Sequence, residues 1–349
     1  MDTKYKKLRI GVVGCGRISQ RHFEAIEKHK DALELVSICD SDQNVINSMG
    51  EEFNSVKKYT NLEHMLKSSL DLDLISICTP SGVHSEQVKI CSSYNVNVIT
   101  EKPMSTRWQD ALDMVASCDL NNVDLHVVKQ NRFNATIQLL KRAVDEKRFG
   151  KIHLVSINVF WTRPQAYYDQ AEWRGTWEFD GGAFMNQASH YVDLLTWLFG
   201  PVKEVQSITS TYRDIQVEDT GVLNILWRNG AVGSMAVSML TYPKNLEGSI
   251  TIIGDKGTAK IGGVAVNKIL EWNFEDSMDY DKDIESASYD TTSVYGKGHI
   301  AYYANLIEYY KNNRGSIISG REGLKSLEVL IAIYLSARDR KTVSLPLSF

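Results

Sequence analysis

Two glycines near the N-terminus, Gly14 and Gly16, have the spacing of a loop that binds the pyrophosphate of a dinucleotide. The first glycine allows a tight turn after a strand, and the second lets a phosphate approach the backbone. The following helix offers the phosphate its unpaired N–H groups and the positive end of its dipole. Ser19 stands where this motif often has a third glycine, and a small residue suffices there. We expect Gly14, Gly16, Arg17 and Ile18 to contact the cofactor.

Asp40 ends the second apolar run of the chain, about 20 residues after the glycine loop. An acidic residue at this position accepts hydrogen bonds from the hydroxyls of the adenosine ribose, and its charge would repel a 2′-phosphate. The pattern therefore predicts NAD rather than NADP. A flavin is the main rival cofactor. The alternative interpretation is a simple glycine turn followed by a solvated aspartate.

Lys102 and His190 are the candidates for handling a substrate proton, because oxidation of a secondary alcohol removes the hydroxyl proton as the hydride leaves. Lys102 follows an apolar run, where doubly wound sheets open their ligand crevice. Imidazole, with an ordinary pKa of about 6.5, needs less tuning than an amine with a pKa of about 10.4. We predict that His190 takes the proton and that Lys102 positions and polarises the substrate oxygen. The reversed assignment stays open.

Asn186 lies four residues before His190, which predicts that both side chains share one face of a helix. Its amide can orient a substrate hydroxyl or the imidazole, but it cannot ionise. Asn186 therefore completes the expected catalytic set without supplying a charge.

The first third of the chain predicts a scaffold for these residues. Short apolar runs alternate with amphipathic stretches, as in a parallel sheet with helices on both faces. The expected strands are 8–13, 33–39, 74–78, 96–99 and 125–128. The expected helices are 18–28, 43–53, 62–67, 83–94 and 108–118. The predicted fold class is α/β, with a doubly wound Rossmann domain over residues 1–129.

The remainder of the chain has longer alternating runs joined by short turns, which predict a large, open, mainly antiparallel sheet. The expected strands are 152–161, 205–212, 220–227, 231–240, 248–253 and 258–261. The expected helices are 136–147, 187–199, 300–312 and 321–337. We assign residues 130–349 to a second, α+β domain.

Composition narrows the class of protein. The chain has 349 residues and a net charge of −4, which gives no general basic field for nucleic acid. No apolar run approaches the roughly 20 residues that cross a bilayer, and the start does not resemble a signal peptide. The five cysteines include no Cys-x-x-Cys pattern. We therefore expect a cytoplasmic protein whose cysteines are small buried hydrophobes, with no metal site and no membrane partner.

Three further motifs carry a resemblance. They are the segment from Cys78 to His84, the tripeptide Glu101-Lys102-Pro103, and the paired glycines Gly181-Gly182 before Asn186 and His190. With the glycine loop, they resemble the Gfo/Idh/MocA family of sugar and inositol oxidoreductases over essentially the whole chain. The resemblance implies a dinucleotide in the first domain, and a second domain whose open sheet builds the substrate site and the oligomer interface. The implied cofactor contacts are Gly14, Gly16, Arg17, Ile18, Asp40, Thr79, Pro80, His84, Glu101, Lys102, Gln130, Trp173 and Arg174, with Glu101 accepting from the nicotinamide ribose.

The segment from Trp161 to Asp193 resembles one branch of that family more specifically. This WlbA/WbpB branch comprises the UDP-N-acetyl-2-amino-2-deoxyglucuronate 3-dehydrogenases of bacterial surface-polysaccharide (O-antigen) synthesis. Asn186 departs from the Asp-x-x-x-His pattern of the wider family but fits the branch. The resemblance implies NAD-dependent oxidation of the C3 hydroxyl of UDP-N-acetylglucosaminuronate. The expected substrate contacts are Lys102, Arg163, Tyr167, Asn186, Gln187 and His190, and fork-shaped arginines suit the phosphates and carboxylate.

Alternatives stay open on the substrate and on the class of protein. The closest rival is a dehydrogenase of neutral UDP-N-acetylglucosamine, or of another sugar or inositol. A protein of another class would bind NAD as a non-catalytic regulator. The branch further implies tightly held NAD(H) that 2-oxoglutarate reoxidises. An open sheet needs its exposed face covered, so we expect a homo-oligomer, with a tetramer favoured over a dimer.

Overall fold

The structure is a computed structural model that describes residues 6–68, 71–291, 293–312 and 318–348. The chain divides into two compact units. The first contains Met1–Val128 and His299–Leu324, and the second contains Lys129–Gly298 and Lys325–Phe349. The predicted division at residue 129 differs from this one because residues 299–324 return to the first unit. The helix that begins there packs on the first sheet, and the backbone N–H of Val127 donates to Ile318 O at 2.8 Å.

The first unit contains a six-stranded parallel sheet in the order β3-β2-β1-β4-β5-β6, as the Rossmann prediction requires. The strands are β1 (Leu8–Val13), β2 (Leu33–Cys39), β3 (Lys57–Tyr59), β4 (Leu74–Ile77), β5 (Asn97–Thr100) and β6 (Leu125–Val127). The strand order reverses between β1 and β4. Doubly wound sheets bind ligands at this switch point, and the loops that follow these two strands contain Gly14 and Thr79.

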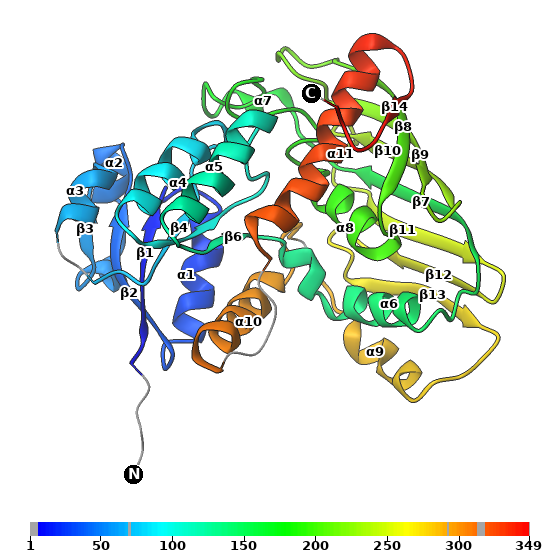
Figure 1. Ribbon diagram of the computed structural model, residues 1–349, viewed down its shortest axis with the longest axis horizontal. Coiled ribbons are helices and arrows are strands. Elements are labelled where there is room, and N and C mark those ends of the chain that lie inside the picture. The colour runs from blue at the N-terminus through cyan, green and yellow to red at the C-terminus, as the bar shows by residue number, and fades with distance from the viewer. Residues whose placement is uncertain (1–5, 69–70, 292, 313–317, 349) are drawn as a thin grey trace. The chain divides into compact units, whose positions relative to one another are not determined.

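Helices cover both faces of the first sheet, with α4 and α5 on one side and α1 and α10 on the other (Figure 1). The helices of this unit are α1 (Ser19–Lys28), α2 (Gln43–Asn47), α3 (Leu62–Lys67), α4 (His84–Ser93), α5 (Trp108–Leu120) and α10 (Gly298–Asn312), with short 3₁₀ turns at Glu51–Phe53 and Ser81–Val83. The predicted helix 43–53 is broken into two pieces at Gly50. The sequence analysis missed β3, because its three residues are polar and form an edge without an apolar run.

The second unit contains an eight-stranded sheet in the order β13-β12-β11-β7-β10-β9-β8-β14. The strands are β7 (Ile152–Phe160), β8 (Val202–Ser210), β9 (Thr220–Trp227), β10 (Val232–Ser238), β11 (Glu247–Gly254), β12 (Gly257–Gly262), β13 (Lys268–Phe274) and β14 (Val343–Ser344). Neighbouring strands pair antiparallel except β7 and β10, which pair parallel. The prediction of a large, mainly antiparallel sheet is therefore confirmed, although β13 and β14 were not predicted.

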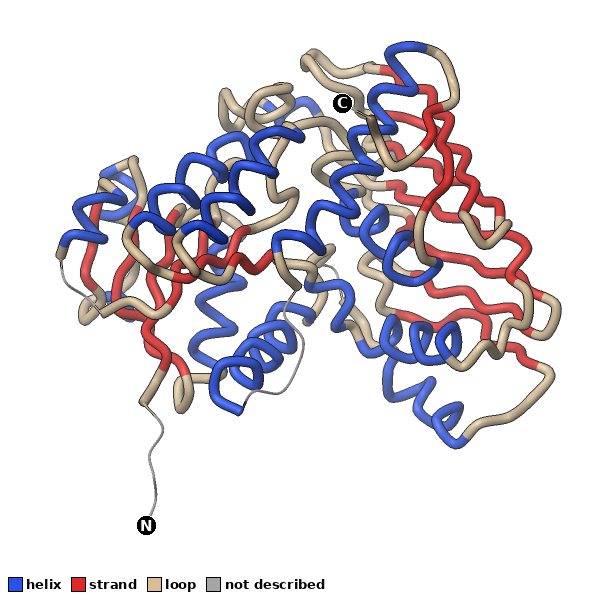
Figure 2. Tube along the Cα trace, in the orientation of Figure 1, coloured by secondary structure: helices blue, strands red, loops and turns tan. Residues whose placement is uncertain are grey.

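One face of this second sheet carries the helices, as Figure 2 shows. The helical segments that belong wholly to this unit are a 3₁₀ turn at Gln130–Phe133, α6 (Ala135–Asp145), α7 (Gln165–Tyr168), α8 (Ser189–Phe199), a 3₁₀ turn at Asp279–Asp283 and α9 (Ile284–Ala287). Helix α11 (Gly320–Asp339) starts in the first unit and ends in the second. On the opposite face, apolar side chains such as Leu154, Val222 and Val232 are exposed.

We expected the cysteines to be small buried hydrophobes and the chain to contain no segment that crosses a bilayer. All five cysteines are buried and free, and burial raises the pKa of the Cys15 and Cys39 thiols to about 12, so they behave as small hydrophobes. Among the described helices, none combines the length and the apolar character that a bilayer-spanning segment requires.

Candidate active site

The loop after β1 has the geometry that a dinucleotide needs. Gly14 has a positive φ of +87°, and a Cβ there would lie 2.8 Å from backbone atoms of Cys78 and Thr79, so only glycine fits. A Cβ at Gly16 would meet nothing within 4 Å, so this backbone borders open space. Helix α1 begins at Ser19, whose hydroxyl donates to the Gly16 carbonyl at 2.7 Å. The exposed backbone before a helix N-terminus fits a pyrophosphate.

Asp40 is held beside this loop by two backbone hydrogen bonds. Its Oδ2 accepts from the N–H of Cys15 at 2.8 Å, and its Oδ1 accepts from the N–H of Asp42 at 2.9 Å. Each carboxylate oxygen can accept a second hydrogen bond, which is what the ribose hydroxyls of NAD require. Arg17 is exposed and Ile18 half-buried in the same loop. The residues present therefore fit a dinucleotide.

His84 joins the loops that follow β4 and β5. Its Nε2 lies 2.9 Å from the Thr79 carbonyl, and its Nδ1 lies 3.1 Å from the Pro103 carbonyl. The ring is fully buried, and this burial lowers its pKa. Both nitrogens face backbone carbonyls, and the expected contact of His84 with the cofactor stays a prediction. The geometry supports a role in holding Thr79 and Pro80, which are half-buried, in place.

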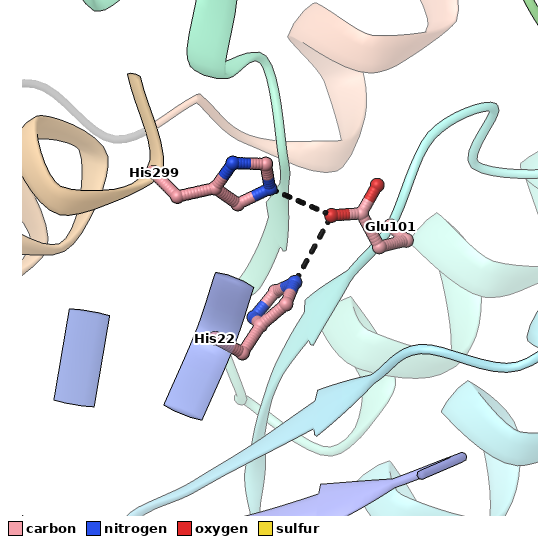
Figure 3. A group of neighbouring side chains, drawn as sticks. All are labelled: His22, Glu101 and His299. Carbon is pink, nitrogen blue, oxygen red and sulfur yellow. Dashed lines mark hydrogen bonds and ion pairs between the residues drawn. The ribbon is translucent and has the colours of Figure 1, made fainter. Parts of the chain in front are cut away.

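Glu101 is the centre of a buried hydrogen-bond network (Figure 3). It follows β5, and its Oε1 lies 3.0 Å from His22 Nε2 on α1 and 3.2 Å from His299 Nε2 on α10. Burial by itself raises the pKa of the Glu101 carboxyl, but the hydrogen bonds from both imidazoles outweigh it and hold this pKa well below the usual range. Glu101 is therefore a buried carboxylate.

The same network fixes the backbone at Lys102. Glu101 Oε2 accepts from the N–H of Lys102 at 3.1 Å, while the Tyr303 hydroxyl lies 2.8 Å from His22 Nδ1. Glu101 therefore holds the backbone of Lys102, and its contact with the nicotinamide ribose stays a prediction. His22, Glu101 and His299 are also residue types that bind metals, but their nitrogen–oxygen distances are those of hydrogen bonds.

In the second unit, Gln130 contacts His190. The amide Nε2 of Gln130 lies 3.2 Å from His190 Nε2, and because an amide NH2 can only donate, the imidazole nitrogen accepts. His190 is the second residue of α8 and is 6% exposed. The structure places the amide of Gln130 against the imidazole, and its expected contact with the cofactor stays a prediction. An accepting nitrogen is unprotonated, as a general base must be.

A buried ion pair anchors the segment that carries Gln130. Arg132 donates from Nε and Nη2 to the two carboxylate oxygens of Asp193, each at 2.7 Å, and Lys129 Nζ lies 3.4 Å from Asp193 Oδ1. Burial by itself raises the pKa of Asp193, but the charges of Lys129 and Arg132 lower this pKa by more. The pKa of Asp193 therefore lies below the usual range. The pairing of Arg132 with Asp193 was not predicted from the sequence. The signal for it was an aspartate inside an otherwise apolar helix, because such a buried charge needs a cationic partner.

We predicted that Asn186 and His190 share one face of a helix. This prediction is wrong, because α8 begins only at Ser189. The backbone N–H of Asn186 donates to Gly182 O at 2.8 Å, and that of Ala188 donates to Ala183 O at 2.8 Å, so a series of turns precedes the helix. The side-chain Nδ2 of Asn186 donates to Asp180. The Ala188 hydrogen bond reaches residue i−5 instead of the i−4 of an α-helix, so regular helix begins only after it.

Arg163, an expected substrate contact, and Arg174, an expected cofactor contact, lie around one tyrosine. The Arg174 guanidinium carbon lies 4.5 Å from the Tyr167 ring centroid and Nη1 donates to its hydroxyl at 2.7 Å, while the Arg163 guanidinium carbon lies 5.1 Å from the same centroid. Arg174 is also 4.5 Å from the Trp173 ring centroid. Gln187 is buried at 6% exposure. The structure thus brings Arg163, Tyr167, Trp173 and Arg174 together as one cationic and aromatic cluster.

Comparisons with known proteins agree with this geometry. Residues 8–129 match the model of the oxidoreductase family NAD-binding Rossmann fold, and residues 141–345 match the C-terminal alpha/beta domain of the same Gfo/Idh/MocA family. The myo-inositol 2-dehydrogenase of Thermotoga maritima is 25% identical over 97% of this chain and 98% of its own.

Two solved structures are more similar. The WlbA dehydrogenase from Chromobacterium violaceum, in complex with NADH and UDP-GlcNAcA, is 54% identical, with a TM-score of 0.93 over 100% of this chain and 98% of that chain. The WlbA dehydrogenase from Bordetella pertussis, in complex with the same two molecules, is 52% identical, with a TM-score of 0.95 over 99% of both chains. On the evidence of its two sheets, its glycine loop and these matches, the chain belongs to the Gfo/Idh/MocA family of oxidoreductases.

Proposed function

We propose that the protein is an NAD-dependent dehydrogenase that oxidises the C3 hydroxyl of UDP-N-acetylglucosaminuronate (UDP-GlcNAcA) to the 3-keto sugar. The observation that carries the proposal is the 52–54% identity, over essentially the full chain, with two dehydrogenases whose structures contain NADH and UDP-GlcNAcA. The retained Lys102 and His190 favour an enzyme over a non-catalytic NAD-binding regulator.

The residues of the first unit fit the cofactor. Gly14 and Gly16 form a loop that a pyrophosphate can approach, and Asp40 lies beside it with two carboxylate oxygens for ribose hydroxyls. Bound NAD⁺ supplies the acceptor for the hydride that leaves the sugar carbon. Lys102, with its backbone held by Glu101, would donate a hydrogen bond to the reacting oxygen and stabilise its developing negative charge.

The residues of the second unit fit the proton transfer and the charged substrate. The Nε2 of His190 is an unprotonated nitrogen that accepts from Gln130, so it can take the hydroxyl proton once the sugar hydroxyl replaces the Gln130 amide at its lone pair. Arg163 and Arg174 are fork-shaped cations beside Tyr167 and suit the carboxylate or phosphates of a UDP-uronate. Asn186 and Gln187 supply amides for sugar hydroxyls. UDP-N-acetylglucosamine has phosphates but no carboxylate, so it would pair with only part of the positive charge of these arginines.

The proposal extends to assembly and to cofactor turnover. Leu154 pairs with Val232 on one side and Ile253 on the other, and all three side chains are exposed on the open face of the sheet. Covering such a patch favours a homo-oligomer, with a tetramer favoured over a dimer, and light scattering of the purified protein tests it. We further propose a cytoplasmic location, tightly held NAD(H), and reoxidation by 2-oxoglutarate.

The test is an assay of the purified protein with NAD⁺, 2-oxoglutarate and either UDP-GlcNAcA or UDP-N-acetylglucosamine, read by mass spectrometry of the sugar and of the reduced 2-oxoglutarate. We expect the uronate to turn over at least about tenfold faster, because one unpaired buried charge contact is worth 1.4 kcal/mol or more. Lys102→Ala and His190→Ala should each abolish turnover. Equal rates on both sugars would contradict the substrate assignment, and NAD binding without turnover of either would favour the regulator.

A further inference from the structure

A carboxylate outside the sequence motifs holds the turn that carries Asn186. Asp180 is 2% exposed, and its Oδ1 accepts a hydrogen bond from the side-chain Nδ2 of Asn186. Its Oδ2 accepts a second hydrogen bond from the backbone N–H of Gly175 at 2.7 Å. One buried carboxylate therefore joins the turn at Gly175 to the turn that leads into α8.

We propose that Asp180 is a positioning residue that fixes the amide of Asn186 for the sugar and sets the turn before His190, an inference that rests on the proposed function. The hydrogen bond from Asn186 Nδ2 to Asp180 Oδ1 turns the NH2 group of the amide toward Asp180. The amide carbonyl oxygen is then directed away from Asp180. In that orientation it acts as an acceptor for a hydroxyl.

The pair accommodates one negative charge. Two carboxylates at hydrogen-bond distance in a buried site do not both ionise near neutral pH. The presence of Asp180 therefore explains why position 186 carries an amide instead of a second carboxylate. Exchanging the two residue types would preserve the hydrogen bond but move the charge from position 180 to the turn before His190.

The backbone transmits the position of Asn186 to α8. The N–H of Asn186 donates to Gly182 O at 2.8 Å, and its carbonyl oxygen accepts from the Ser189 hydroxyl at 2.9 Å. Ser189 is the first residue of α8, and His190 is the second. A displaced Asn186 therefore displaces the start of the helix and the imidazole with it.

The experiment compares Asp180→Asn, Asn186→Asp and the double exchange Asp180→Asn/Asn186→Asp, with the exposed Asp169→Asn as the matched control. Asp180→Asn removes the group that dictates the amide orientation, so we expect kcat to fall about tenfold with a smaller change in KM. Asn186→Asp places two carboxylates together, and we expect a loss of about 100-fold near pH 8 that lessens as the pH falls. The control should behave as the parent protein.

The double exchange gives the sharpest result. It restores one carboxylate and one amide, so we expect activity about tenfold above that of Asn186→Asp. Because the charge now lies in the turn before His190, the acidic limb of the kcat/KM profile should move to higher pH. A merely structural role for Asp180 would lower stability without moving this limb. An Asp180→Asn variant with unchanged kcat and unchanged pH profile would overturn the proposal, as would a double exchange no more active than Asn186→Asp.

Thermal unfolding of the same variants, without substrate, separates this proposal from the proposed function. Asn186→Asp should lower the melting temperature at pH 8, and the double exchange should recover most of the loss. If the parent protein fails to oxidise UDP-GlcNAcA but this recovery appears, the proposed function fails while the pairing stands. If the melting temperatures of the two variants coincide, the pairing itself is contradicted, even where the single variant folds poorly.

Discussion

The side-chain amide of Gln130 donates to Nε2 of His190 at 3.2 Å, and this contact defines the state of the imidazole. Gln130 lies in the 3₁₀ turn Gln130–Phe133, and the pairing of Arg132 with Asp193 fixes that turn to α8. The donor, the acceptor and their anchor thus belong to one rigid piece of the second unit. The nitrogen that receives a proton in the proposed reaction is kept unprotonated by a neighbouring donor.

Gln130→Met tests this relationship, because methionine has a similar volume but no N–H group. Without the donor, protonation of His190 Nε2 is opposed less, so the acidic limb of the kcat/KM profile should move to higher pH. We expect kcat/KM at pH 7 to fall about tenfold. Gln109→Met, at an exposed position on α5, is the matched control. A Gln130→Met profile that superimposes on that of the parent would exclude this role.

Asp193→Asn should destabilise the second unit strongly. The substitution leaves Lys129 and Arg132 buried without their counter-charge, at a cost of about 3–5 kcal/mol. The folded-state pKa of Asp193 is lowered, so its contribution is present above the ordinary aspartate pKa and is lost as the pH falls through the folded-state value. Urea unfolding measures this loss. Asp339→Asn, which breaks a surface pair with Arg338, should change the unfolding free energy little.

The contribution of Glu218 to the free energy of unfolding should depend on pH in the opposite direction to that of Asp193. It is buried under Gly182, where a Cβ would lie 1.7 Å from Glu218 Oε2, and it accepts from the Phe184 N–H and the Tyr334 hydroxyl, each at 2.9 Å. Burial outweighs these hydrogen bonds and raises the pKa of Glu218 from 4.5 to about 7. The stability that this carboxyl provides is therefore full below pH 4.5 and is lost as the pH rises through 7.

Glu218→Gln should consequently become more stable than the parent protein as the pH rises. The difference in unfolding free energy should approach about 3 kcal/mol at alkaline pH and shrink toward about pH 5. Urea unfolding at several pH values gives this curve, and the exposed Glu285→Gln serves as the control. A Glu218→Gln difference that stays constant across the pH range would show that Glu218 does not titrate as described.

The two glycines of the dinucleotide loop should respond differently to alanine. Gly16→Ala places its methyl group in open space, so the free energy of unfolding without NAD⁺ should stay unchanged. Because that space is where a pyrophosphate approaches, affinity for NAD⁺ should fall about tenfold or more. Gly14→Ala should lower stability as well, because φ is +87° and the backbone near Thr79 is 2.8 Å away. Calorimetric titration with NAD⁺ and urea unfolding measure both quantities.

The sequence predicted those parts of the fold that local patterns determine. Apolar runs identified five of the six strands of the Rossmann sheet, and the glycine loop identified its ligand end. The edge strand β3 was missed because Lys57, Lys58 and Tyr59 show no alternation. The return of α10 to the first unit was missed for another reason: it depends on contacts such as Tyr303 with His22, which are distant in sequence.

The candidate site was predictable in residue type but not in pairing. Lys102 and His190 stand out because charged or titratable residues adjoin apolar segments. The partners of the site residues come from packing: Gln130 against His190, and Asp180 against Asn186. The assumed helix between Asn186 and His190 failed because the N–H of Ala188 donates to Ala183 O, one residue further back than in an α-helix, and α8 begins only at Ser189. The spacing of residues along the sequence does not show which side chains pair in this way.

The most direct test of the proposed reaction is the fate of the hydrogen on C3 of the sugar. Purified protein, with its bound NAD(H) first oxidised by 2-oxoglutarate, is mixed with UDP-GlcNAcA that carries deuterium at C3, and the cofactor released on denaturation is analysed by mass spectrometry. Oxidation at C3 predicts one deuterium in each NADH formed and a 3-keto product. Unlabelled NADH would place the oxidation at another carbon, and the absence of NADH formation would contradict the dehydrogenase assignment itself.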